Sequence, residues 1–263
     1  MSTDFYEERY CAFLDVLGFS NCVTSAFSVA SEAEREEGIS RLVGLNEQIG
    51  EELRAMSEEC QKISFSHFSD SIFLSVPVTE EDGIGQLFYR IQRLCTALLI
   101  RGFLTRGGVV CGLVHSGNDV VFGPGLIEAY RLESRVARHP RIVVAKSVRD
   151  RLTSDSDASQ KLIWPTDGPP HINCLQLFED LAQNVVRRGF PEVFSEEKYK
   201  RRFEFLKTIC NLINRELSNT RDEPDVFTKV RWLADQLNAR VISKGDPTFP
   251  GWPGLISDHS DVS

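Results

Sequence analysis

The sequence predicts a fold in which helices pack on a β-sheet, of either the α/β or the α+β class. The main observation is that apolar, strand-like segments alternate with amphipathic helical segments over roughly the first 150 residues. The second is length, because 263 residues can bury one substantial core and leave a smaller part beside it. Beyond about residue 150 the pattern changes to loop-like stretches followed by helices.

The first elements follow from short-range patterns. An apolar run before a glycine predicts the first strand, and Ser31 with Glu34 forms a capping box that begins a long helix. Apolar residues at helical spacing predict the helix that follows the second strand region. The expected elements are a strand at 9–17, a short helix at 21–30, a long helix from Ser31, a strand or hairpin at 62–76, and a helix at 84–98.

The next elements include a strand that is unusually rich in glycine, which often marks the close approach of another backbone or a ligand. They are strands at 103–113 and 120–122, a helix at 126–138, a strand at 141–145, and two helices at 192–218 and 224–238. We therefore expect a first domain over residues 1–150, a helical extension over 151–245 and a flexible tail over 246–263.

Composition excludes several classes of protein. The net charge of −8 argues against a nucleic-acid-binding surface, and no apolar run approaches the roughly 20 residues of a membrane span. The acidic start is unlike a signal peptide. Seven scattered cysteines without a C-x-x-C pair are typical of reduced thiols, and the five histidines lack the spacing of a zinc site. We expect a cytoplasmic protein that binds neither membrane nor nucleic acid.

Two aspartates are the strongest chemical signal. Asp15 lies in an apolar strand with Gly18 three residues later, and Asp70 lies in a second apolar segment, where we expect it inside the strand. An unpaired charge in such a strand is costly, so a partner is expected. Carboxylate oxygens are ligands that Mg²⁺ prefers, and backbone N–H groups after a glycine turn can meet phosphate. The pair predicts a two-metal centre for phosphoryl transfer.

Four motifs in order resemble the catalytic domain of class III nucleotidyl cyclases, over roughly residues 9–150. They are Phe13-Leu14-Asp15-Val16-Leu17-Gly18-Phe19, Ser69-Asp70, Arg106-Gly107-Gly108, and Leu132-Glu133-Ser134 after Gly123. The resemblance implies an α+β fold with a ferredoxin-like βαββαβ core sheet and a C-terminal helical extension. It also implies that the ribose 3′-oxygen of a nucleoside triphosphate attacks the α-phosphorus and pyrophosphate leaves.

The resemblance also implies the roles of single residues. Two Mg²⁺ or Mn²⁺ ions would be held at each site, and a head-to-tail homodimer would share its sites between chains. Arg106 would touch either the substrate or a neighbouring acid. The implied metal ligands are Asp15, Val16 and Asp70; the implied catalytic residues are Arg131 and Arg106; the implied substrate contacts are Leu17, Gly18, Phe19, Ser66 and Phe68, the last two toward the base.

Three positions depart from the purine cyclases of this class. Ser66 stands where they carry Lys or Glu, Pro124 stands at their other base-reading position, and Ile127 replaces the transition-state asparagine. This pattern resembles the pyrimidine cyclases of bacterial anti-phage (Pycsar) defence, as does the segment at 229–233. That resemblance implies conversion of UTP to cyclic UMP, or less often synthesis of cyclic CMP, as a signal to a separate effector protein.

Other functions stay open at this point. A purine cyclase with an unusual pocket is one, and a nucleotide-binding regulatory module without turnover is another, which Ile127 makes plausible. A haloacid-dehalogenase phosphatase fits less well, because Leu17 occupies the position of its second aspartate. No G-x-x-x-x-G-K-[S/T] motif occurs, which argues against P-loop chemistry.

Overall fold

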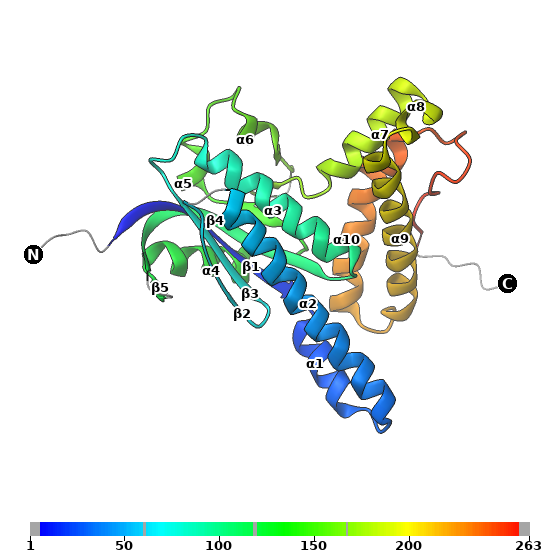
Figure 1. The fold of residues 1–263 in the computed structure, drawn as a ribbon, viewed down its shortest axis with the longest axis horizontal. Coiled ribbons are helices and arrows are strands. Elements are labelled where there is room, and N and C mark those ends of the chain that lie inside the picture. Colours follow the sequence, from blue (N-terminus) through cyan, green and yellow to red (C-terminus); the bar gives the residue numbers. More distant parts are fainter. Residues whose placement is uncertain (1–5, 60–61, 118–119, 167, 258–263) are drawn as a thin grey trace, which may run out of the picture. The chain divides into compact units, whose positions relative to one another are not determined.

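The computed structural model describes residues 6–59, 62–117, 120–166 and 168–257. The chain divides into two compact units, Met1–Asn173 and Cys174–Ser263. The first contains a sheet with helices and the second is helical (Figure 1). The predicted α+β class is confirmed.

The first unit alternates strands and helices, as the apolar pattern predicts. Ser31 caps the long helix, since its Oγ accepts from the N–H of Glu34 at 3.5 Å. The elements are β1 (Glu7–Leu17), α1 (Phe19–Ser28), α2 (Glu32–Glu59), β2 (Ser64–Phe68), β3 (Ser71–Pro77), α3 (Gly83–Ile100), β4 (Leu104–Gly117), β5 (Val120–Phe122), α4 (Pro124–Val136), β6 (Ile142–Val144), α5 (Lys146–Arg149), α6 (Asp157–Gln160), β7 (Leu162–Ile163) and β8 (His171–Ile172).

The sheet has the order β2-β3-β1-β4-β6-β8-β7, and β5 pairs with β4. The three pairings among β2, β3, β1 and β4 are all antiparallel, and helices connect β1 to β2 and β3 to β4. This order and connectivity are those of the ferredoxin-like βαββαβ core. β6 extends the sheet parallel to β4, which makes the sheet mixed.

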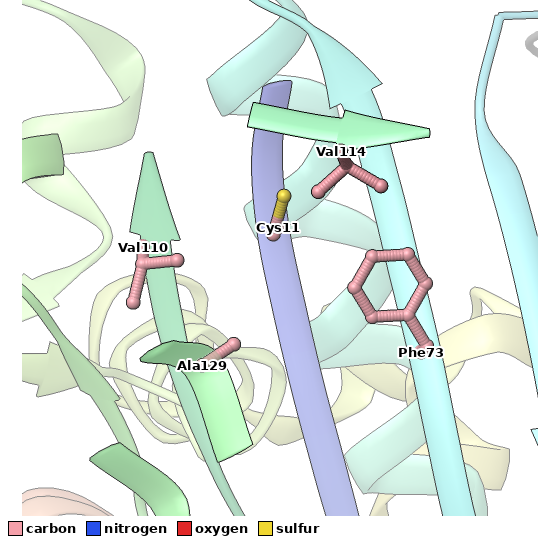
Figure 2. Close-up of a cluster of buried hydrophobic side chains, with 5 residues drawn as sticks. All are labelled: Cys11, Phe73, Val110, Val114 and Ala129. Atoms are coloured by element: carbon pink, nitrogen blue, oxygen red, sulfur yellow. The ribbon is translucent and has the colours of Figure 1, made fainter. Parts of the chain in front are cut away.

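Helices cover the two faces of the sheet differently. On one face α3 packs, where Thr105 Oγ1 donates to Cys95 Sγ at 3.1 Å. On the other face α4 lies close to β4, because a Cβ at Gly108 would be 2.7 Å from the Ala129 carbonyl oxygen. Figure 2 shows the apolar cluster that fills this second interface, made of Cys11, Phe73, Val110, Val114 and Ala129. Side chains of a strand alternate between these faces, so Phe13 and Asp15 lie on the α4 side.

The segment at 62–76 is a hairpin, and the expectation that Asp70 sits inside a strand is wrong. Ser69 and Asp70 form the turn between β2 and β3. Ser69 has φ 59°, in the left-handed region that tight turns use. Because these two short polar residues make the turn, the carboxylate of Asp70 lies at the end of the sheet instead of within it.

After residue 150 the structure adds elements that the sequence pattern does not predict. The first unit continues to Asn173, whereas the first domain was expected to end near residue 150. β7 and β8 complete the sheet in this stretch, but each has two residues and therefore shows no alternation. Within the described residues, no disulfide joins the cysteines.

The second unit is helical, with buried side chains such as Phe178, Leu206 and Leu237. Its elements are α7 (Gln176–Arg188), α8 (Phe190–Phe194), α9 (Glu197–Asn219), α10 (Pro224–Arg240) and the 3-10 turn η1 (Ile242–Lys244). The expected helix at 192–218 is divided between α8 and α9, and α7 is additional. None of the helices in the described ranges is long and apolar enough to cross a bilayer.

Part of the expected tail is attached to this unit. The Nε1–H of Trp252 donates to the carbonyl of Ile242 at 3.1 Å, and the N–H of Ile256 donates to Asn238 Oδ1 at 2.8 Å. These contacts fix the chain as far as Ile256 on the helices. Residues 258–263 of the expected tail lie outside the described ranges.

Candidate active site

The end of β1, the β2–β3 turn and β4 meet at one end of the sheet. Asp15 is paired in register with Ser71 on β3 and with Arg106 on β4. The N–H of Val16 donates to the carbonyl of Asp70 at 3.1 Å. The fold therefore brings Asp15 and Asp70, 55 residues apart in sequence, to adjacent positions.

Arg106 lies between two carboxylates. Its Nε is 3.1 Å from Asp15 Oδ2 and 2.6 Å from Glu133 Oε1. The side chains of Asp15 and Arg106 are 20% and 27% exposed, while that of Glu133 is 2% exposed. Ion pairs shielded from water in this way interact more strongly than surface pairs. The expected contact of Arg106 with a neighbouring acid is present in the structure, with both Asp15 and Glu133.

Glu133 comes from α4 and was not expected to belong to the site. Burial raises its pKa to about 7, the charge of Arg106 opposes this rise, and the charges of Asp15 and Asp70 add to it. The charges of both aspartates thus act on the carboxyl group of Glu133. Helical spacing could have revealed it, because Gly125, Ala129 and Glu133 recur every four residues and share the face that packs on the sheet.

The raised pKa of Glu133 predicts a pH-dependent stability. In the folded state the pKa of Glu133 is about 7, above the ordinary value of 4.5. The contribution of Glu133 to the free energy of unfolding is therefore complete below pH 4.5 and is lost as the pH rises through about 7. Glu133→Gln cannot titrate. The free energy of unfolding of the native chain, relative to that variant, should fall by up to about 3 kcal/mol between pH 4.5 and 8. Urea unfolding across this range measures the difference, and parallel curves would contradict the prediction.

The turn after β1 supplies backbone donors. Gly18 has φ 78° and precedes α1, whose first residue is Phe19. No side chain among the described residues caps this end of α1 by a hydrogen bond. The first N–H groups of a helix have no partner inside the helix, and together with the helix dipole they favour an anion. Leu17, Gly18 and Phe19 are therefore placed next to Asp15, where a phosphate contact was expected.

Ser66 and Phe68 lie on β2, on the same face of the sheet as Asp15, because Phe68 pairs with Ser71 and Ser71 with Asp15. Phe68 is 83% exposed. A hollow of about 340 Å³ is lined by Ser64, Phe65, Ser66, His67, Ser116, Gly117, Val120 and Val121. Ser66 thus lines a hollow, whereas Phe68 stands outside that lining.

No hydrogen bond or ion pair between described residues joins Arg131 to Asp15 or Asp70. Arg131 is exposed on α4, two residues before the buried Glu133, so it points away from the sheet. No ion pair involves it among the described residues. Ile127, one turn earlier, is 51% exposed, and the ring of Tyr130 packs edge-on against Phe13 at 5.4 Å.

The oxygen atoms at this end of the sheet fit a hard divalent cation. The carboxylates of Asp15 and Asp70 and the backbone carbonyl of Val16 are oxygen donors at adjacent strand ends. No cluster of three or more His, Cys, Asp or Glu side chains with metal-binding geometry occurs in the part of the chain that the structure describes. Water and phosphate oxygens would complete the coordination, as is usual for Mg²⁺.

No protein-family model and no curated protein matches the chain. Among solved structures, the guanylyl cyclase domain of the RhoGC fusion protein from the aquatic fungus Blastocladiella emersonii aligns over 63% of this chain and 94% of its own, at 17% identity and a TM-score of 0.46. The guanylate cyclase domain of RhGC from Catenaria anguillulae in complex with GTP aligns over 63% and 93%, at 15% identity and a TM-score of 0.45.

The adenylyl cyclase CyaB from P. aeruginosa aligns over 64% of this chain and 92% of its own, at 14% identity and a TM-score of 0.43. All of these TM-scores lie below 0.5. The proposed function therefore rests on the geometry of this chain's own site. The site lies at the end of the sheet where Asp15, Asp70, Arg106 and Glu133 meet.

Proposed function

We propose that this protein is a nucleotidyl cyclase that converts a nucleoside triphosphate to a 3′,5′-cyclic monophosphate and pyrophosphate. The observation that carries the proposal is the placement of Asp15 and Asp70 on adjacent strand ends, beside the Gly18 turn at the start of α1. Oxygen ligands for cations and backbone donors for phosphate thus lie side by side. A triphosphate with its counter-ions needs both.

In the proposed reaction the 3′-oxygen of the ribose forms a bond to the α-phosphorus and its proton passes to solvent water. The bond between the α-phosphorus and the oxygen that bridges it to the β-phosphate breaks, and that oxygen leaves with pyrophosphate. Asp15, Asp70 and the carbonyl of Val16 would hold two Mg²⁺ or Mn²⁺ ions. When bound, such ions lower the pKa of the attacking hydroxyl and neutralise the leaving pyrophosphate. The N–H groups that follow Gly18 would orient the phosphates, so the contribution of the chain is mainly positioning.

A pyrimidine base is the proposed substrate specificity, with UTP converted to cyclic UMP. It is supported by Ser66, Pro124 and Ile127, which replace the purine-reading residues and the asparagine of purine cyclases. Ser66 lines the hollow near β5. A hydroxyl both donates and accepts a hydrogen bond, so it does not itself separate uracil from cytosine. Cyclic CMP synthesis and a purine substrate are the alternatives.

We extend the proposal to the assembly. The exposed position of Arg131 on α4 would let it reach the α-phosphate in the site of a second copy, so a head-to-tail homodimer would have two shared sites. A guanidinium there would stabilise the charge that develops on the phosphate. The product would act as a cytoplasmic signal in anti-phage defence through a separate effector.

The test is product analysis with ATP, GTP, CTP and UTP, each incubated with the purified full chain and Mn²⁺. Chromatography with mass detection should show a cyclic monophosphate, with UTP as the best substrate. A cyclic product from ATP or GTP alone would leave the cyclase but overturn the pyrimidine specificity. Saturable nucleotide binding without any product would favour the regulatory module, for which Ile127 is the supporting residue.

A further inference from the structure

Two carboxylates lie within reach of the same N–H group of Arg106, the Nε–H. Both ion pairs of Arg106, with Asp15 and with Glu133, are made by the same atom, Nε. An arginine Nε carries a single hydrogen, so it can be directed to one oxygen at a time. In the structure that hydrogen bond goes to Asp15 Oδ2 at 3.1 Å.

One carboxylate oxygen of Glu133 is therefore left as a buried acceptor without a hydrogen bond from the described residues. Its Oε1 is closer to Nε, at 2.6 Å, yet it accepts no hydrogen bond from any of the described residues. A buried polar atom without a partner is unfavourable, and more so when it carries charge. The arrangement would be relieved if the Nε–H turned from Asp15 to Glu133.

We infer that Glu133 is a positioning residue that takes the guanidinium of Arg106 from Asp15 when a divalent cation binds, and so frees Asp15 to act as a ligand. The inference rests on the proposed metal-binding role of Asp15 and Asp70. Without the cation, Arg106 is paired with Asp15. With the cation present, a guanidinium held beside the same carboxylate would repel it, and Glu133 provides the place to which that charge moves.

The charge balance of the cluster supports this role. The charges of Asp15 and Asp70 both act on Glu133, and Arg106 is a cation paired with Asp15 and with Glu133. If Glu133 were neutral, the charge of Arg106 would be balanced by Asp15 alone. Cation binding would then have to break that ion pair without a replacement, and the affinity would fall.

Titration of the full-length chain with MnCl₂ at pH 8 tests the inference. The readout is free Mn²⁺ by electron paramagnetic resonance, without nucleotide, so that binding is measured apart from activity. Glu133→Gln should weaken Mn²⁺ binding by about 10-fold, the size of effect known for residues that orient metal ligands. Glu128→Gln, which removes an exposed carboxylate from the same helix, should leave binding unchanged.

Two further variants separate this role from a structural one. Arg106→Met removes the competing charge, so it should bind Mn²⁺ at least as tightly as the native chain. The double variant Arg106→Met/Glu133→Gln should recover the affinity lost in Glu133→Gln. If Glu133 merely anchored α4, removing both partners would weaken binding further. If the Glu133 variants fold poorly, weaker Mn²⁺ binding in the single Arg106→Met variant would still overturn the inference.

The outcomes distinguish this inference from the proposed function. Native affinity in Glu133→Gln, or a double variant that binds no better than that single variant, would overturn the inference while Asp70→Asn still abolished Mn²⁺ binding. If the native chain bound no Mn²⁺ that Asp70→Asn removes, the proposed metal site would fail, and this inference would fail with it.

Discussion

Asp70→Asn is expected to reduce the rate of cyclic nucleotide formation by about 1000-fold or more, because the lost metal contact supplies several kcal/mol of transition-state stabilisation. Asp15→Asn should have the same effect. Each substitution keeps the size of the side chain and removes only its charge. The Val16–Asp70 hydrogen bond is made by the backbone, so it should persist in the Asp70 variant. The measurement is the initial rate with UTP and Mn²⁺.

A matched control for these variants is Asp150→Asn. Asp150 is an exposed acid of the first unit that pairs with Lys146. Its substitution should leave the rate within the error of the native value. Circular dichroism and thermal unfolding of all three variants should show that the fold is retained. Native rates in folded Asp15 and Asp70 variants would refute the assignment of the site.

Mixing two inactive variants is expected to restore activity. Asp70→Asn chains would lack a metal ligand and Arg131→Ala chains would lack the arginine that reaches the partner's site. In a mixed dimer one site collects both defects and the other collects none. After random exchange of an equimolar mixture, half of the dimers are mixed, so about one quarter of the native activity should return.

The mixing ratio gives the discriminating result. Activity should be greatest at equal amounts and fall on either side, because only mixed dimers have an intact site. Two variants in the same residue, such as Asp70→Asn with Asp70→Ala, provide the control and should stay inactive at every ratio. Failure of the Asp70 and Arg131 variants to complement at any ratio would contradict shared sites.

The sequence was sufficient to predict the sheet-forming core, because its elements have strong periodic patterns. Local signals in the sequence predict the strand that contains Asp15, the helix that Ser31 caps, and α3. Each of these elements is present. Asp70 shows the limit of such patterns. A run of apolar residues around a serine and an aspartate predicted a strand through Asp70, but the two polar residues make a turn instead.

The unpredicted elements lack a signal that a single sequence can give. β7 and β8 have two residues each, and they are strands only because the rest of the sheet offers them partners. The contact between Arg106 and Glu133 depends on how closely α4 approaches β4 at Gly108, which is a matter of tertiary packing. The sequence therefore shows Glu133 only as part of the Leu132-Glu133-Ser134 motif, and its contact with Arg106 becomes known only from the structure.

The central claim is that Asp15 and Asp70 hold divalent cations at the end of the sheet where the triphosphate binds. The most direct test is anomalous diffraction at the manganese edge from crystals grown with Mn²⁺ and a UTP analogue that cannot cyclise. Manganese peaks in contact with both carboxylates, next to the phosphates, are the predicted result. Manganese bound elsewhere, with the two carboxylates directed to separate parts of the molecule, would contradict the claim.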